Sequence, residues 1–153
     1  MKASTMFGLL AMLCSQALAV ELDGTYTVAS AGTELYLEDA SGQIILEEGD
    51  PQAWFFIEAE TDRYAIVNGV TNQYINCGST AGAVCKASDV AQLFQIDNIS
   101  DNIYTFLEPE SQLLLHRTTD NQLDLSPPTP TNDESFELTQ ASYSARIRNF
   151  GIH

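Results

Sequence analysis

The strongest constraint on the fold is an internal repeat with a period of about 40 residues. Three segments begin alike around a tyrosine, at Tyr26, Tyr64 and Tyr104. Each segment closes on an aromatic residue two positions after Gln or Glu, at Trp54, Phe94 and Phe136. Self-similarity at a fixed period is typical of a fold built from copies of one unit. We expect repeats over residues 23–58, 61–98 and 101–140, within one domain spanning residues 20–140.

Each unit contains two further apolar runs between these landmarks. The first runs are Tyr36-Leu37, Tyr74-Ile75 and Leu114-Leu115, and the second are residues 42–44, 82–84 and 121–123. Apolar and polar residues alternate, and Val, Ile, Thr, Tyr and Phe are enriched, which predicts short strands. A helix over residues 111–117 is the alternative for one run. The chain therefore reads as all-β, with about four strands per unit and twelve in total.

One such unit is too short to bury its apolar face alone, so three units are expected to converge on a shared core. Closure of the strands around this core also hides their edges. The predicted inward residues are Tyr26, Leu37, Ile44, Trp54, Phe56, Tyr64, Ile75, Val84, Phe94, Ile96, Tyr104, Leu115, Leu123, Phe136 and Leu138.

The N-terminus has the pattern of a secretory signal. Lys2 precedes an apolar stretch over residues 6–13, and Ala17-Leu18-Ala19 offers small residues at the positions that signal peptidase reads. We expect a signal peptide over residues 1–19, cut after Ala19, and a secreted, extracellular protein. A membrane anchor is the alternative, but the apolar run is shorter than the roughly 20 residues a span needs.

Secretion changes the interpretation of the cysteines, because Cys14 leaves with the signal peptide. Cys77 and Cys85 remain as an even pair in an oxidising compartment, which predicts a disulfide between them. Closing so short a loop stabilises the fold by about 2–3 kcal/mol. A metal site is the alternative, but the histidines lie far away in sequence and no Cys-x-x-Cys occurs. Asn98-Ile99-Ser100 is a sequon and predicts N-glycosylation at Asn98.

The repeat pattern resembles the β-trefoil fold, and in particular the ricin B-like lectins. Their Gln-x-Trp signature is present as Gln52-Ala53-Trp54, partly kept as Gln92-Leu93-Phe94 and lost at Glu134-Ser135-Phe136. The resemblance covers residues 23–140 and implies a barrel of six strands capped by six strands in hairpins. It also places the cysteine pair where this family often bridges the second and third strands of a repeat.

The resemblance implies shallow sugar pockets, each with an acidic residue after the second strand, a stacking aromatic near the third, and the motif Gln. Such pockets fit sugars, which offer hydroxyl pairs to carboxylates and C–H faces to rings. The candidate ligand-binding residues are Glu38, Asp39, Gln52, Asn76, Gln92 and His116. The stacking positions fall near Ile45 and Leu46, on Lys86 and on Leu125, none of which is aromatic. A purely structural role is the alternative: Gln52 and Gln92 would brace turns, and Glu38 and Asp39 would lie in a solvated loop.

Charge and composition exclude several functions. With 21 acidic and 6 basic residues, the formal net charge is −15, which disfavours nucleic acids and anionic membranes. No phosphate-binding loop, cofactor signature, calcium loop or catalytic constellation is evident, so we expect a non-enzymatic protein without metal or cofactor. The acidic cluster at Glu47, Glu48 and Asp50 predicts a solvated turn, or a surface for a basic partner or weakly held calcium.

Two segments fall outside the repeat pattern. Residues 126–133 are rich in proline and form an extended connection, which is either a passive linker or a stiff loop of the kind with which trefoil inhibitors enter protease clefts. The C-terminal tail, residues 141–153, holds Arg146 and Arg148 and can dock on acidic residues of its own domain or serve as an interaction arm. The expected function is carbohydrate binding, and the alternative is a secreted protease inhibitor or an effector of a host protein.

Overall fold

The computed structural model describes residues 22, 24–129 and 131–141. The predicted signal peptide and the tail beyond Ala141 lie outside these residues. The described part is all-β, with antiparallel strands joined in one 12-stranded sheet and a single turn of 3-10 helix, η1. The elements are β2 (Thr25–Ser30), β3 (Tyr36–Ala40), β4 (Gln43–Glu47), β5 (Trp54–Glu60), β6 (Arg63–Asn68), β7 (Tyr74–Asn76), β8 (Lys86–Ser88), β9 (Leu93–Ser100), β10 (Ile103–Glu108), β11 (Leu113–Arg117), β12 (Leu123–Ser126), η1 (Asn132–Glu134) and β13 (Phe136–Gln140).

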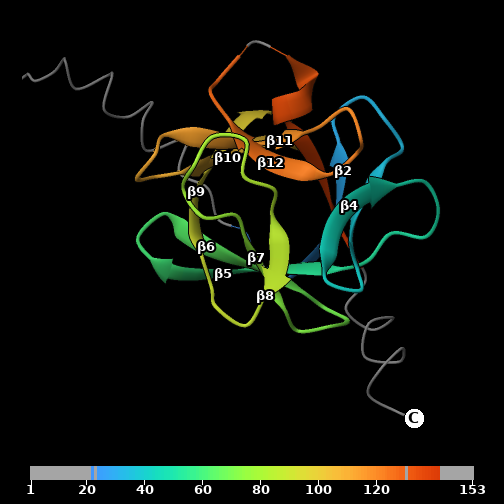
Figure 1. The fold of residues 1–153 in the computed structure, drawn as a ribbon. Helices are drawn as coiled ribbons and strands as arrows, with labels where there is room; N and C mark the ends of the chain where they lie inside the picture. The colour runs from blue at the N-terminus through green and yellow to red at the C-terminus, as the bar shows by residue number, and fades with distance from the viewer. Residues whose placement is uncertain (1–21, 23, 130, 142–153) are drawn as a thin grey trace, which may run out of the picture.

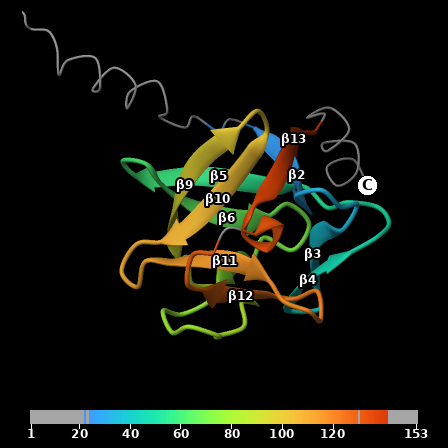
Figure 2. The ribbon, with the colours of Figure 1, turned by 90° about the horizontal axis from the view of Figure 1, so that it is seen from above.

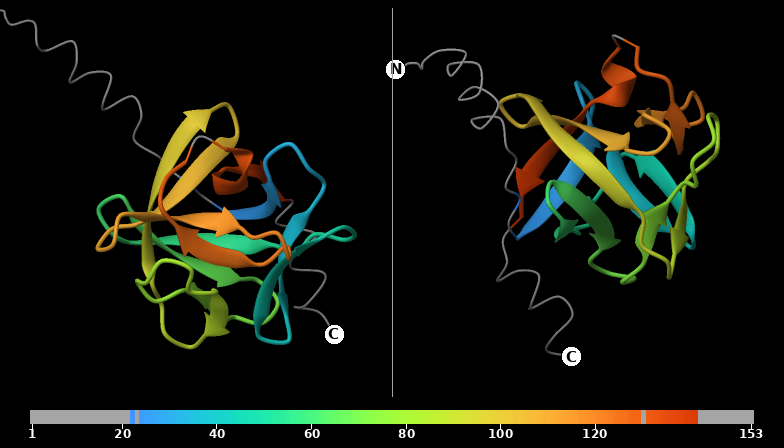
Figure 3. Two further views of the ribbon diagram at one scale, coloured as in Figure 1. Left: turned by 45° about the horizontal axis from the view of Figure 1, so that its top comes forward. Right: turned by 90° about the vertical axis from the view of Figure 1, so that its left-hand side faces the viewer.

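The sheet closes on itself. Strands β2, β5, β6, β9, β10 and β13 pair in a continuous ring, in which β13 joins β2 and β2 joins β5. The other strands form the hairpins β3–β4, β7–β8 and β11–β12. Figure 1 shows the strands wrapped around a common centre, and the right-hand view of Figure 3 shows β13 alongside β2. Because the ring is closed, its six strands expose no free edge to other chains.

The strand positions predicted from the sequence overlap observed strands, except in one run, and the run at 121–123 meets β12 only at Leu123. Residues 82–84 were expected to be a strand of their own hairpin, but β8 begins later, at Lys86. Residues 82–85 instead run along β12, where Gly82 N–H donates to the Leu125 carbonyl at 2.7 Å and Cys85 N–H to the Leu123 carbonyl at 2.9 Å. Within the segment 111–117, residues 111–112 form a turn and Leu113–Arg117 form β11, so the helical alternative is wrong.

The core follows from the two-residue alternation of the strands. In β4, Ile44 and Leu46 are buried while the residues between and beside them are more exposed. Nearly all predicted inward residues lie in this core or pack against it, with Tyr26 and Tyr104 partly buried at its margin. Val84 is the exception, since it is 44% exposed. Its segment runs alongside β12, where Val84 lies opposite Asp124 rather than in the core.

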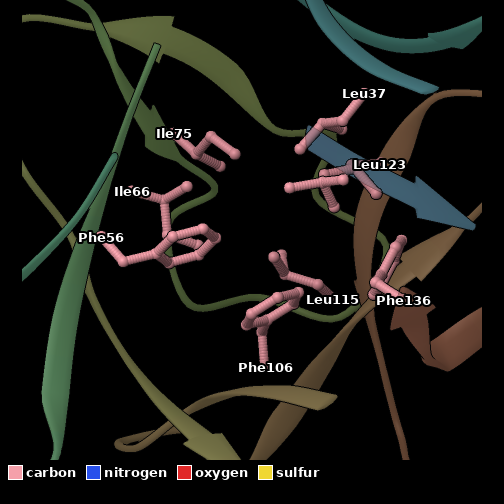
Figure 4. Close-up of a pocket in the computed structure, with 9 residues that line it drawn as sticks. Leu37, Phe56, Ile66, Ile75, Phe106, Leu115, Leu123 and Phe136 are labelled. Carbon is pink, nitrogen blue, oxygen red and sulfur yellow. The ribbon is translucent and has the colours of Figure 1, made fainter. Parts of the chain in front are cut away.

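Aromatic rings link the strands across the centre. Tyr26 meets Phe56 edge-on at 5.7 Å between ring centroids, Phe56 stacks on Phe106 at 6.0 Å, and Phe106 contacts Phe136 at 5.5 Å. Burial of each such ring contributes about 1.5–3 kcal/mol to stability. A small cavity of about 10 Å³ remains between these side chains (Figure 4). Its lining is wholly apolar, so an ordered water would find no hydrogen-bond partner there.

The predicted disulfide between Cys77 and Cys85 is present, and both cysteines are buried in the core. It ties the end of β7 to the segment that runs along β12. Among the described residues, no helix has the length and hydrophobicity to cross a bilayer.

Candidate functional site

Gln52, at the first Gln-x-aromatic position, ties three segments of the chain together. Its side-chain oxygen accepts hydrogen bonds from the Asp39 backbone N–H at 2.8 Å and from Asn68 Nδ2 at 2.7 Å. Two residues further on, the buried Trp54 donates its indole N–H to the Leu37 carbonyl at 3.0 Å. This geometry fits the structural alternative for Gln52, since its oxygen is used within the fold.

Asp39, predicted as a candidate ligand-binding residue with a solvated loop as the alternative, is also used within the fold. It lies in β3 and is only 6% exposed. One carboxylate oxygen accepts the Gly42 N–H at 2.8 Å, and the other accepts the Thr71 hydroxyl at 2.7 Å. The β3–β4 turn needs this support because Ser41 and Gly42 both adopt positive φ angles, the conformation of a tight hairpin turn. The loop prediction for Glu38 and Asp39 is therefore wrong.

The second unit shows a similar arrangement around Gln92. Its oxygen accepts the Cys77 N–H and its amide donates to the Gly78 carbonyl, each at 2.6 Å. Asn76 donates from Nδ2 to the Val90 carbonyl at 3.1 Å and accepts the Gly78 N–H at 3.2 Å. Both candidate residues of this unit therefore fix the turns on either side of the disulfide.

His116 lies on β11, opposite Asp124 of β12. Its Nδ1 lies 2.7 Å from an Asp124 carboxylate oxygen, and the two side chains are 25% and 17% exposed. The neighbouring Arg117 turns elsewhere: it binds Asp133 at 2.9 Å and donates to the Ser30 hydroxyl at 2.8 Å. Arg117 thus links β11 to β2 and to the connection that precedes β13.

Glu134 stands where the first two units carry Gln, and its surroundings differ. It is 2% exposed, and its Oε1 accepts the Thr129 N–H at 2.6 Å. Its Oε2 is buried and has no hydrogen-bond partner among the described residues. The side chain therefore holds the Pro-rich connection, residues 126–133, rather than the end of a neighbouring strand.

A surface hollow lies beside β4. We call it the acidic groove, and it has a volume of about 640 Å³. Its lining residues are Leu35, Ile45, Leu46, Glu47, Glu48, Asp120 and Asn121. The β11–β12 turn reaches β4 here, since Leu46 N–H donates to the Asn121 carbonyl at 2.8 Å (Figure 2). Carboxylates that lie more than 70 residues apart in sequence thus share one surface.

The outer face of the β3–β4 ribbon adjoins this groove. The register places Tyr36 opposite Glu47 and Glu38 opposite Ile45, so these four side chains share one face. Partial burial, and secondly the negative charge of Glu47, raise the pKa of the Glu38 carboxyl. Tyr36 is half-buried, which leaves part of its ring accessible. A ring beside two carboxylates is chemically suited to a sugar, although Tyr36 and Glu47 were not among the candidate residues.

The alternation Tyr36-Leu37-Glu38 was the signal that could have found Tyr36, since it places the first and third side chains together on one face. The sequence prediction looked for a stacking position on the third strand instead. Leu46 and Leu125, the non-aromatic residues at or near that position, are inward side chains, 2% and 0% exposed. Among the described residues, no cluster of three or more His, Cys, Asp or Glu is arranged to hold a metal ion.

Asn98, the predicted glycosylation site, lies in β9 next to the β9–β10 turn. Its Nδ2 donates to the carbonyls of Asp101 at 2.9 Å and Ile103 at 3.1 Å. Both hydrogens of the amide therefore serve the turn in the folded chain. A glycan on this nitrogen would replace one of them, so glycosylation at Asn98 remains a prediction with a structural cost.

Comparison with known proteins identifies the fold. No family model matches the chain, and no curated protein sequence matches it. Among solved structures, the Macrolepiota procera ricin B-like lectin in complex with lactose aligns with a TM-score of 0.69 and 13% identity, over 80% of this chain and 100% of the lectin. The designed 3-fold symmetric protein ThreeFoil aligns with a TM-score of 0.68 and 15% identity, over 78% of this chain and 100% of its own.

A proteinase inhibitor from Coprinopsis cinerea is similar as well, with a TM-score of 0.64 and 17% identity over 80% of this chain and 100% of the inhibitor. These likenesses confirm the expected β-trefoil fold. At such identities they show the fold alone, which hosts both glycan-binding and protease-binding proteins.

Proposed function

We propose that the protein is a secreted, non-catalytic carbohydrate-binding protein whose glycan site is the outer face of β3–β4 and the adjoining acidic groove. The observation that carries this proposal is the placement of Tyr36, Glu38 and Glu47 on the same outward face of the β3–β4 ribbon, beside a surface hollow. Carboxylates accept hydrogen bonds from adjacent sugar hydroxyls, and the Tyr36 ring offers an apolar surface to the C–H side of a sugar ring.

The other candidate residues take different parts in this proposal. Asp39, Gln52, Asn76 and Gln92 hold the turns, because their polar atoms bond to neighbouring segments. The His116 side chain is 25% exposed and has no aromatic neighbour on the β11–β12 ladder, where Leu114, Asp124 and Ser126 lie nearby. The first unit is therefore the proposed binding unit.

The proposal includes the organisation expected from the sequence. Residues 1–19 serve as a signal peptide, consistent with the disulfide found in the described part of the chain. Strands β2–β5, β6–β9 and β10–β13 form three units of four strands, which correspond to the expected repeats 23–58, 61–98 and 101–140, although β5 runs to Glu60 and β9 to Ser100. This grouping is supported by the corresponding contacts of Gln52 and Gln92 to the backbone at the ends of β3 and β7.

A glycan array probed with residues 20–153 tests the proposed function. We expect binding to a defined set of sugars, competed by the free sugar and weakened about tenfold or more by Tyr36→Ala or Glu47→Gln, the loss of roughly one good contact. Tyr74→Ala is the matched control, because Tyr74 starts β7 as Tyr36 starts β3 but lies opposite Ser88 rather than a carboxylate. Silence on the array, or equal losses in all three variants, contradicts the proposal.

Protease inhibition is a second candidate function, favoured by the way residues 126–133 are held. Pro127, Pro128 and Thr129 are exposed, while Glu134 grips the Thr129 N–H and Arg117 binds Asp133. An exposed segment that is anchored at its base can enter a protease cleft with little loss of entropy. Inhibition of a protease panel that disappears when residues 127–129 are replaced by Gly-Ser-Gly would favour this function over the first.

A further inference from the structure

Charge is divided unequally between the described domain and the C-terminal tail. The described residues hold 19 of the 21 acidic residues but only three of the six basic ones, Arg63, Lys86 and Arg117. Two of these three already contact carboxylates, Arg63 with Glu60 and Arg117 with Asp133. Residues 142–153 contain Arg146 and Arg148 and no acidic residue. The tail is thus a cationic segment attached to a strongly anionic domain.

The acidic groove is the part of that domain best suited to a cationic chain segment. Glu47, Glu48 and Asp120 line it, and within the described residues no cation or side-chain hydrogen bond pairs with their carboxylates. Leu35 and Ile45 also line it, are half-buried and supply aliphatic surface. Such a hollow matches a peptide that alternates arginine with apolar residues, because the two kinds of contact lie side by side.

The tail leaves the domain within reach of this groove. Ala141 N–H donates to the Thr25 carbonyl at 2.8 Å, so the described chain ends beside the first residue of β2. Leu35, at the groove, accepts a hydrogen bond from Ser30 N–H at the other end of the same strand. One strand of six residues separates the two points, about 20 Å. Twelve residues follow Ala141, enough to span roughly 40 Å when extended.

We propose that residues 142–153 dock in the acidic groove of their own domain. Arg146 and Arg148 lie against Glu47, Glu48 and Asp120, and the apolar side chains of Ile147 and Phe150 cover Leu35 and Ile45. The tail then occupies the surface that adjoins Glu38 and Tyr36.

Tethering makes this contact favourable although each ion pair is weak. An exposed pair contributes about 0.2–1 kcal/mol, which would not hold a free peptide. A short flexible tether gives the tail an effective concentration in the millimolar range, so that a few weak contacts suffice. The net negative charge of the domain adds a long-range attraction that salt weakens.

A spin label on the tail tests the proposal in the chain of residues 20–153. Ser144→Cys provides the only free thiol, because Cys77 and Cys85 form a disulfide and Cys14 precedes the tested chain. We expect the label to broaden the amide NMR signals of Ile45, Asp120 and Asn121. The broadening should fade at about 0.5 M salt, where the screening length falls below roughly 5 Å.

Charge variants complete the test. Glu47→Gln combined with Glu48→Gln should abolish the broadening. Asp97→Asn combined with Glu110→Gln should preserve it, since this control removes two exposed carboxylates, one in β9 and one in the β10–β11 turn, and these elements lie across the view of Figure 2 from β4. Broadening confined to the surroundings of Thr25 and Gln140, or equal effects of both double variants, overturns the proposal.

A mixed sample distinguishes docking within one chain from docking on a second copy. Spin-labelled chains without isotope label are mixed with isotope-labelled chains that lack the spin label. Broadening of Ile45 in this mixture would show that the tail binds a neighbour, which also overturns the proposal. The experiment contains no glycan, so its result is independent of the result of the glycan array.

Discussion

Gln52 and Glu134 occupy like positions in the sequence, each two residues before a fully buried aromatic side chain, yet they hold their surroundings in different ways. Gln52 accepts two hydrogen bonds through one oxygen and joins β3, its own segment and the end of β6. Glu134 accepts one, and its second oxygen is buried without a partner in the described structure. The difference shows that the aromatic position preserves the core, while the residue before it determines which loop is fixed and how firmly.

The largest effect is expected from Gln52→Ala. This change removes the acceptor for Asn68 Nδ2, and Asn68 is 0% exposed. A buried donor left unpaired, together with the lost bond to Asp39 N–H, should lower the free energy of unfolding by about 2–3 kcal/mol. Chemical denaturation measures the loss. Glu134→Ala is the matched variant and should lower the free energy of unfolding by less. An equal or larger loss in Glu134→Ala would contradict the conclusion that Gln52 fixes its surroundings more firmly than Glu134 does.

Glu108 contrasts with Glu134, because it is a buried carboxylate whose hydrogen bonds are made. Burial acts to raise its pKa, but hydrogen bonds from the Ser111 hydroxyl and from the Ser111 and Glu110 backbone outweigh burial, and the pKa of Glu108 lies below its usual value of 4.5. Glu108→Gln should therefore lower stability at pH 7 by about 1–2 kcal/mol.

The pH dependence of this variant has a defined sign. A carboxyl with a lowered pKa in the folded state stabilises the fold above pH 4.5, and this contribution is lost as the pH falls through the folded-state value. The difference in free energy of unfolding between the parent protein and Glu108→Gln should thus become smaller at acidic pH. Denaturation curves at several pH values measure this difference. A difference that stays constant down to low pH would contradict a lowered pKa of Glu108 as its cause.

The smallest effect, with the opposite sign, is expected from Glu134→Gln. The substitution restores the Gln of the motif, keeps an acceptor for Thr129 N–H and removes a carboxylate whose second oxygen is unpaired. Replacing an uncompensated buried group by a neutral amide of the same shape should raise stability by about 1 kcal/mol. A decrease on thermal or chemical denaturation would show that the carboxylate has a partner that favours it.

The parts of the fold that could be predicted from the sequence are those governed by local pattern. Alternation places Ile44, Leu115 and Leu138 in strands facing inward. The sequence pattern also located the disulfide. These features depend on residues near one another in the chain or on the period of the repeat.

The parts that could not be predicted from the sequence depend on contacts between segments that lie far apart in the chain. Val84 is exposed because its segment runs along β12 rather than within its own hairpin. The acidic groove unites Glu47 with Asp120 only because the β11–β12 turn bonds to β4. Asp39 was misplaced because its partner Thr71 lies 32 residues further along the chain. No period or local motif encodes these approaches.

Trp54 makes the first motif visible to spectroscopy. It is the only tryptophan in the sequence, it is fully buried, and its indole N–H is bonded to the Leu37 carbonyl. Its fluorescence should therefore be emitted at short wavelength in the folded chain and shift towards the red as water reaches the ring. Trp54 fluorescence is thus an intrinsic optical probe beside Gln52. It can report loss of the Gln52 hydrogen bonds without any attached label.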